Sequence, residues 1–152
     1  MMDSEKGGRP MKNQYQLPCN IAQSLNLIGD KWTLLILYAV MHGNATYKEL
    51  QQALPGIASN LLSERLKTLE EDGLVSSQLY QEHPPRYQYC LTPAGKDLHM
   101  VFHSIMLWGE KHLTTCYKHL IHTSCGHSVQ MKYYCEECGR EISADELDIT
   151  EA

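Results

Sequence analysis

Two short helical patterns joined by a Leu-Pro-Gly turn, and followed by two strand patterns, occupy residues 46–91. Helices are expected over residues 47–53 and 59–72, because apolar side chains recur there at helical spacing. Strands are expected at residues 74–80 and 86–91. The two prolines between them cannot continue a strand ladder and therefore form a hairpin tip. This order predicts a mainly α-helical fold with a small β-hairpin, of the winged helix–turn–helix type.

Further helical patterns flank this segment. One runs from Ile21 to Ile28, and a second, apolar almost all round, follows Asp30 and indicates a buried helix. A long helix is expected from Lys96 to about His119, because Thr92 and Pro93 form a helix-start pattern and apolar residues follow at helical spacing. These helices supply the apolar surface that a two-stranded hairpin cannot bury alone.

Charge divides the chain into two regions. The 152 residues carry a formal net charge of -5. Acidic and basic side chains balance in residues 1–120, so the whole excess lies in residues 121–152. Because negative charge repels phosphate, the acidic end is a poor nucleic-acid contact, and any such contact must be local to the first region. The chain shows no secretory signal pattern and no apolar run that could span a bilayer, so we expect a cytoplasmic protein.

The second helix of the helix–turn–helix carries the candidate DNA contacts. The major groove of B-DNA admits one helix, while a β-hairpin reaches the flanking backbone or minor groove. If the leucines of this helix face the core, its open side carries side chains that can reach base edges, namely Ser59, Asn60, Ser63 and Lys67. Phosphate contacts are expected from the basic side chains Lys48, Arg65, Lys67 and Arg86. The alternative is that all of these are ordinary solvated surface residues.

Three motifs carry a resemblance to a known family. They are GDKW at residues 29–32, a run ending in ERLKTLEEDGL at residues 64–74, and PPR at residues 84–86 followed by LTPAG. Over residues 17–113 the chain resembles the HxlR family of bacterial transcription regulators, which are relatives of the MarR type. The resemblance implies a homodimeric regulator, most simply a repressor, whose two recognition helices read a pseudo-palindromic operator. It also implies that the outer helices pack between the chains.

The resemblance assigns roles to individual residues. By position, Ser59, Asn60, Ser63 and Lys67 would read the operator and Arg86 would be the contact of the wing. A cysteine at the position of Cys19 would be a redox or electrophile sensor responding to an oxidant or a small-molecule inducer. A thiol near a helix N-terminus has its reactive thiolate favoured, although most free cysteines are simply small buried hydrophobes. Cys90 and Cys116 are expected to pack, and Cys116 could also form an intermolecular disulfide at the dimer interface.

The last third of the chain repeats one metal-binding pattern: a ligand, two residues, a cysteine and a glycine. The two copies supply His122 with Cys125, and Cys135 with Cys138. Such spacing lets one tight turn present two donors to one ion, and four donors close a structural tetrahedral Zn²⁺ site. The segment is therefore expected to be a small zinc-ribbon-like module. His127 is the alternative fourth ligand, although only one residue separates it from Cys125, which makes it difficult for both side chains to bind one ion.

Other functions remain open for the same cysteines. The module could sense zinc rather than only bind it, which would make the chain a zinc-sensing regulator. A thiol oxidoreductase using Cys135 and Cys138 is opposed by Glu136 and Glu137, because acids between the cysteines disfavour thiolate chemistry. No phosphate-binding glycine loop or nucleophile elbow is present, so we expect no enzymatic activity.

Four parts are therefore expected along the chain. They are a flexible leader at residues 1–16, a DNA-binding and dimerisation domain at residues 17–120, a zinc-knuckle module at residues 121–143 and an acidic tail at residues 144–152.

Overall fold

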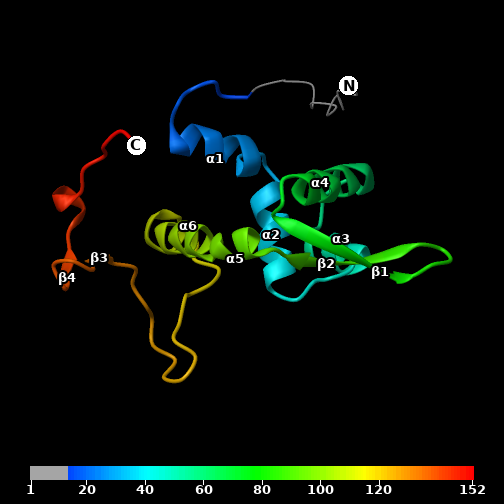
Figure 1. Ribbon diagram of the computed structural model, residues 1–152. Coiled ribbons are helices and arrows are strands. Elements are labelled where there is room, and N and C mark those ends of the chain that lie inside the picture. Colours follow the sequence, from blue (N-terminus) through cyan, green and yellow to red (C-terminus); the bar gives the residue numbers. More distant parts are fainter. Residues whose placement is uncertain (1–13) are drawn as a thin grey trace, which may run out of the picture. The chain divides into compact units, whose positions relative to one another are not determined.

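The computed structural model describes residues 14–152, so most of the expected leader lies outside the described residues. The chain divides into two units, of which the first ends at Leu98 and the second runs from His99 to Ala152. The elements, labelled in Figure 1, follow in the order α1 (Asn20–Ile28), α2 (Thr33–Met41), α3 (Tyr47–Ala53), α4 (Ser59–Glu71), β1 (Val75–Gln81), β2 (Arg86–Leu91), α5 (Pro93–Asp97), α6 (His99–His112), β3 (Tyr133–Cys135), β4 (Arg140–Ile142) and a 3-10 turn, η1 (Ala144–Glu146).

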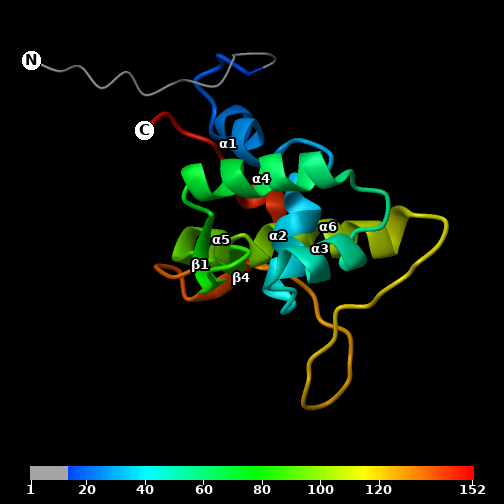
Figure 2. The same ribbon diagram turned by 90° about the vertical axis from the view of Figure 1, so that its right-hand side faces the viewer.

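The first unit is a winged helix–turn–helix, as predicted. Its core is apolar, and the side chains that are almost completely buried come from α2, α3, α4 and β1: Ile36, Leu37, Leu50, Leu62, Leu66, Leu69 and Val75. The continuous apolar run of α2 places it at the centre of this core. In both views α4 lies above α3 (Figures 1 and 2), and in Figure 1 the β1–β2 hairpin projects beyond the helices of the first unit.

Local sequence signals fix where these elements begin and end. At the start of α3 the Thr46 side chain accepts the Glu49 N–H, and the Glu49 carboxylate accepts the Thr46 N–H, which together form a capping box. Those hydrogen bonds lower the pKa of Glu49. Helix α4 ends before Gly73, whose φ of 73° is left-handed, and the Leu74 N–H donates back to the Leu69 carbonyl. The predicted starts and ends of these two helices are thereby confirmed to within one residue.

The hairpin forms the wing. β1 and β2 pair antiparallel, with Val75 opposite Leu91 near the base and an irregularity before Gln81. The base is buried and the tip is exposed, so the hairpin extends outward from the core. The Tyr89 N–H also donates to the Ala45 carbonyl, which ties the wing to the loop in front of α3.

The second unit differs from the long helix that the sequence predicted. A one-residue break at Leu98 separates α5 from α6, and α6 ends at His112 instead of near His119. Two consecutive β-branched residues, Thr114 and Thr115, follow the end of α6 and have low helix propensity. β3 and β4 then form a short antiparallel hairpin near the C-terminal end. None of the helices in residues 14–152 is long and apolar enough to cross a membrane.

Candidate nucleic-acid interface

Helix α4 presents two contrasting faces. Leu62, Leu66 and Leu69 are at most 1% exposed and anchor the helix in the core, as predicted. The side chains proposed to read bases, Ser59, Asn60, Ser63 and Lys67, are all exposed on the first two to three turns. Among residues 14–98 no element covers this polar face, so α4 can enter a groove of the width of the DNA major groove.

The N-terminal end of α4 is held by α3. The Tyr47 hydroxyl donates to the Ser59 carbonyl at 2.7 Å, and the Gln51 amide donates to the Ser59 hydroxyl at 2.8 Å. The Ser63 hydroxyl donates back to the same Ser59 carbonyl. These contacts fix the angle between the two helices of the helix–turn–helix, which sets how far α4 can enter a groove. Asn60, between the two serines in the chain, is exposed, and its side chain makes no hydrogen bond to the described residues.

A tyrosine-rich cavity of about 430 Å³ separates the start of α3 from the wing. Its polar rim includes two of the predicted phosphate contacts, Lys48 on α3 and Arg86 on β2, both exposed. Tyr89 lies deeper, and burial raises the pKa of its hydroxyl. The two cations therefore line one concave surface, where each can contact a phosphate of a polyanion.

Arg65 does not share this open position. Its side chain is only 27% exposed, and its Nε lies 3.4 Å from the Asp30 carboxylate and is buried without a hydrogen bond. Asp30 in turn accepts the backbone N–H groups of Trp32 and Thr33 and the Thr33 hydroxyl. Arg65 is thus a brace between the start of α2 and the middle of α4, and it is the one member of the predicted contact set that the described structure turns toward the protein.

The cysteines occupy different surroundings. Cys19 is the N-cap residue of α1 and is exposed, so its thiol lies at a helix N-terminus as the sequence predicted. The expectation that Cys90 and Cys116 pack inside was wrong, because both are exposed. Cys90 lies on the outward side of β2, and Cys116 lies beyond the end of α6, where its Sγ is 3.9 Å from the His119 ring nitrogens. His119 itself pairs with Glu110 at 2.7 Å.

The predicted metal ligands form two separate pairs. His122 Nδ1 lies 3.2 Å from Cys125 Sγ, and the Cys138 thiol and backbone N–H both donate to Cys135. Within residues 14–152 no three histidine, cysteine or acidic side chains are gathered at one point in an arrangement that would hold a metal ion. The structure therefore brings the ligands together in twos and not as a set of four.

Sequence reasoning missed the residues that support the interface. Tyr47 and Gln51 were read only as part of a short helix, and the pairing of Asp30 with Arg65 was not foreseen. Asp30 lies in the GDKW motif and Arg65 in the ERLKTLEEDGL run. The presence of both residues in motifs that carry the family resemblance was the sequence signal that could have indicated their contact.

The chain matches known proteins over most of its length. Residues 27–117 match the family described as HxlR-like helix-turn-helix. An uncharacterized HTH-type transcriptional regulator of Mycobacterium tuberculosis is 36% identical over 128 residues, which cover 82% of this chain and 80% of that protein.

Solved structures agree with this match. The crystal structure of PA1607, described as a transcription factor, superposes with a TM-score of 0.77 and 27% identity, over 90% of this chain and 97% of that one. The redox regulator HypR in its oxidized form superposes with a TM-score of 0.58 and 30% identity, over 64% of this chain and all of that one.

The family match covers more than half of the chain, and the geometry of α3, α4 and the wing is that of a DNA-binding module. Such proteins regulate transcription and are not enzymes, as the sequence predicted, so the thiol oxidoreductase alternative is without support. The chain belongs to the HxlR family of helix–turn–helix transcriptional regulators.

Proposed function

We propose that the protein is a cytoplasmic repressor that binds a pseudo-palindromic operator as a homodimer, with α4 of each subunit in the major groove. The observation that carries this proposal is the two-sided character of α4. Its leucine side chains are buried in the core, and its polar side chains on the opposite face are exposed. A helix held on one side and polar on the other is the element that direct readout of base edges requires.

The contacts divide into two kinds. Ser59, Asn60 and Ser63 offer hydroxyl and amide groups at the N-terminal end of α4, where short polar side chains reach base edges. Lys48, Arg86 and Lys67 are exposed cations that suit phosphates, which position the protein without specifying sequence. Lys67 also lies 4.0 Å from Glu71, so it must exchange this weak exposed pair for a phosphate. Arg65, paired with Asp30, is left as a brace.

Homodimer formation is supported by apolar side chains that remain exposed on α1 and α6. Ile21 is 69% exposed, and Trp108 and Ile105 are 61% and 53% exposed. Exposed aromatic and aliphatic groups concentrated on helices mark surfaces that a partner covers. A symmetric dimer then requires two operator half-sites separated by about one helical turn of DNA or a multiple of it.

Control by an oxidant is the proposed regulation. Cys19 is exposed at the N-terminus of α1, one of the helices assigned to the dimer interface, and the similar protein HypR is a redox regulator. A covalent change at Cys19 would therefore alter the packing of the subunits and release the operator. Replacing Cys19 with Ser should abolish operator release by diamide, while Cys90→Ser, at an exposed wing position, should leave it intact. Release that is unchanged in Cys19→Ser would remove the sensor role.

The DNA-binding proposal is tested with two substitutions on sequences enriched from random duplex DNA. Asn60→Ala should weaken binding to the enriched sequence by about 1–3 kcal/mol and leave binding to scrambled DNA nearly unchanged. Lys48→Ala should weaken both and reduce the slope of log affinity against log salt by about one. Fluorescence anisotropy over a salt series measures both quantities. Equal losses on the two DNAs for Asn60→Ala would place the base contacts elsewhere.

A further inference from the structure

The segment from His122 to Ile142 builds the same turn twice. The Gly126 N–H donates to the His122 carbonyl at 2.8 Å, and the Gly139 N–H donates to the Cys135 carbonyl at 2.9 Å. Both glycines are left-handed, with φ of 72° and 63°, a conformation that other residues rarely adopt. In each turn the first and fourth residues are the candidate ligands. The sequence repeat is therefore also a repeat of backbone geometry.

The first turn holds its two donors at the spacing that one zinc ion needs. With Zn–N near 2.0 Å and Zn–S near 2.3 Å, a tetrahedral ion separates a nitrogen and a sulfur ligand by about 3.5 Å. His122 Nδ1 and Cys125 Sγ are 3.2 Å apart. The Ser124 hydroxyl lies 3.2 Å from the same ring and can orient it, as groups behind a metal ligand commonly do.

The structure also distinguishes His122 from His127, the other candidate for the fourth zinc ligand. The His127 carbonyl accepts the His122 N–H and closes the base of this loop, next to the bridge between Ile121 and Ser128. Among the described residues only the His122 ring contacts Cys125, whereas the His127 ring makes no such contact. This contact favours His122 over His127 as the partner of Cys125 in a metal site.

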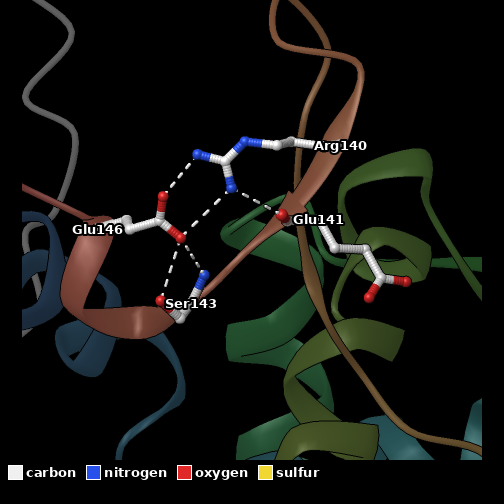
Figure 3. Close-up of polar contacts among 4 residues, drawn as sticks. All are labelled: Arg140, Glu141, Ser143 and Glu146. Atoms are coloured by element: carbon white, nitrogen blue, oxygen red, sulfur yellow. Dashed lines mark hydrogen bonds and ion pairs between the residues drawn. The ribbon is translucent and has the colours of Figure 1, made fainter.

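The second turn lies at the tip of the β3–β4 hairpin, in which Cys135 is paired with Arg140. The Gly139 N–H, which donates to the Cys135 carbonyl, closes this turn between the two strands. Beyond it Arg140 binds Glu146 at 2.6 Å, while the Glu146 carboxylate also accepts the Ser143 N–H at 2.9 Å (Figure 3).

Apolar burial does not hold these two turns together. From His103 to Ala152 no described residue is buried, and the most enclosed side chains of the segment, among them Val129, Cys135 and Ile142, are only half-buried. The ion pairs of the hairpin are exposed, so their attraction is weakened by water. A segment of this length without a core needs another cross-link to keep one structure.

We propose that one Zn²⁺ ion joins the two turns, bound by His122, Cys125, Cys135 and Cys138. Three thiolates and an imidazole are the soft donors that select zinc in a tetrahedral site. Four protein ligands leave no position for water, so the ion is structural and not catalytic. The residues between Gly126 and Cys135 form the connection that closes when the ion binds. This proposal does not depend on DNA binding.

Metal content and ligand substitution test it on the full chain. Protein purified without chelator should contain one zinc ion per chain, and cobalt added to the zinc-free protein should give the visible absorption of a tetrahedral thiolate complex. His122→Ala and Cys138→Ser should each weaken zinc binding by about tenfold or more. His127→Ala is the matched control and should bind as the wild type does. Zinc content near zero, or loss of metal in His127→Ala but not in His122→Ala, would overturn the ligand set.

Thiol labelling gives a second readout that needs no substitution. In the zinc-loaded protein Cys125, Cys135 and Cys138 should resist alkylation while Cys19, Cys90 and Cys116 react, as mass spectrometry of the peptides would show. Equal labelling of all six would contradict a shared ion. Operator affinity with and without a chelator separates the structural role from sensing. A reversible change with the winged-helix fold intact, followed by circular dichroism, would show a sensor and overturn the structural role.

Discussion

At the residue scale, the ion pair between Asp30 and Arg65 joins two motifs that lie far apart in the sequence. Asp30 binds the first backbone N–H groups of α2 and also faces the Arg65 guanidinium of α4. The pair lies at the border of the core, where it is screened by water less than a surface pair is. It holds the recognition helix against the central helix, so its loss would alter the platform rather than the DNA contact itself.

Arg65→Ala should therefore lower the free energy of unfolding by about 1–2 kcal/mol, because Asp30 loses its cation and the alkyl stem of Arg65 leaves a gap. Urea unfolding followed by circular dichroism measures the change. Lys67→Ala is the control on the same helix, and its side chain is 79% exposed, so it should change stability by less than about 0.5 kcal/mol. An Arg65→Ala protein as stable as Lys67→Ala would refute the brace.

Glu146 gives a pH prediction at the same scale. Hydrogen bonds from Arg140 and from Ser143 lower the pKa of its carboxyl to about 2. Because the folded pKa lies below the unfolded value of about 4.3, the contribution of this group to stability is present above that value and is lost as the pH falls through about 2. NMR titration of the carboxyl carbon should show the low midpoint, and Arg140→Ala should move it upward. A midpoint near 4.3 in the wild type would show that the contact does not form in solution.

At the scale of elements, short-range signals were enough to predict most of the first unit. The capping box of Thr46 and Glu49, the glycine after α4 and the Thr92-Pro93 start of α5 each act within a few residues, so they can be read from the sequence. The exposure of Cys90 could not be predicted in this way. It depends on which neighbouring elements cover the position, and spacing along one segment does not contain that information.

The same limit applies to the candidate site. The open face of α4 follows from the leucine spacing, so Ser59, Asn60 and Ser63 were correctly expected to be exposed. The partial burial of Arg65 was not, because it depends on Asp30, 35 positions earlier in the chain. A residue beside a helix's core stripe faces solvent or a neighbour according to what packs there, and only the tertiary structure decides between the two.

The junction between the wing and α5 yields an element-scale prediction. A Cβ at Gly95 would lie within 3.0 Å of the carbonyl oxygen of Leu74, the residue before β1, so α5 could not approach this backbone so closely with any other residue. Gly95→Ala should therefore destabilise the protein by about 1–3 kcal/mol in thermal or urea unfolding. Gly109→Ala is the matched control in α6, where a Cβ meets only the end of the Leu113 side chain, and it should be neutral or stabilising. Equal free energies of unfolding for Gly95→Ala and Gly109→Ala would show that the junction can shift without a loss of stability.

At the scale of the whole molecule, the proposed homodimer would cover the exposed apolar side chains of α1 and α6. Trp108→Asp should shift the protein toward monomer in sedimentation velocity experiments, because a carboxylate would have to be buried in the interface. Ile149→Asp is the control, since Ile149 is 94% exposed in the C-terminal tail, and it should leave the sedimentation unchanged. A Trp108→Asp protein that sediments as the wild type does would place the dimer interface elsewhere.

The most direct test of the central claim is the symmetry of the DNA that the protein selects. Duplexes enriched from a random pool by the wild-type chain should contain an inverted repeat whose half-sites lie about one helical turn apart, or a multiple of it, with two chains bound per site. The Asn60→Ala protein should lose the preference for bases in both half-sites equally. Enrichment of a single asymmetric site, or of no sequence at all, would contradict the reading of an operator by two α4 helices related by a two-fold axis.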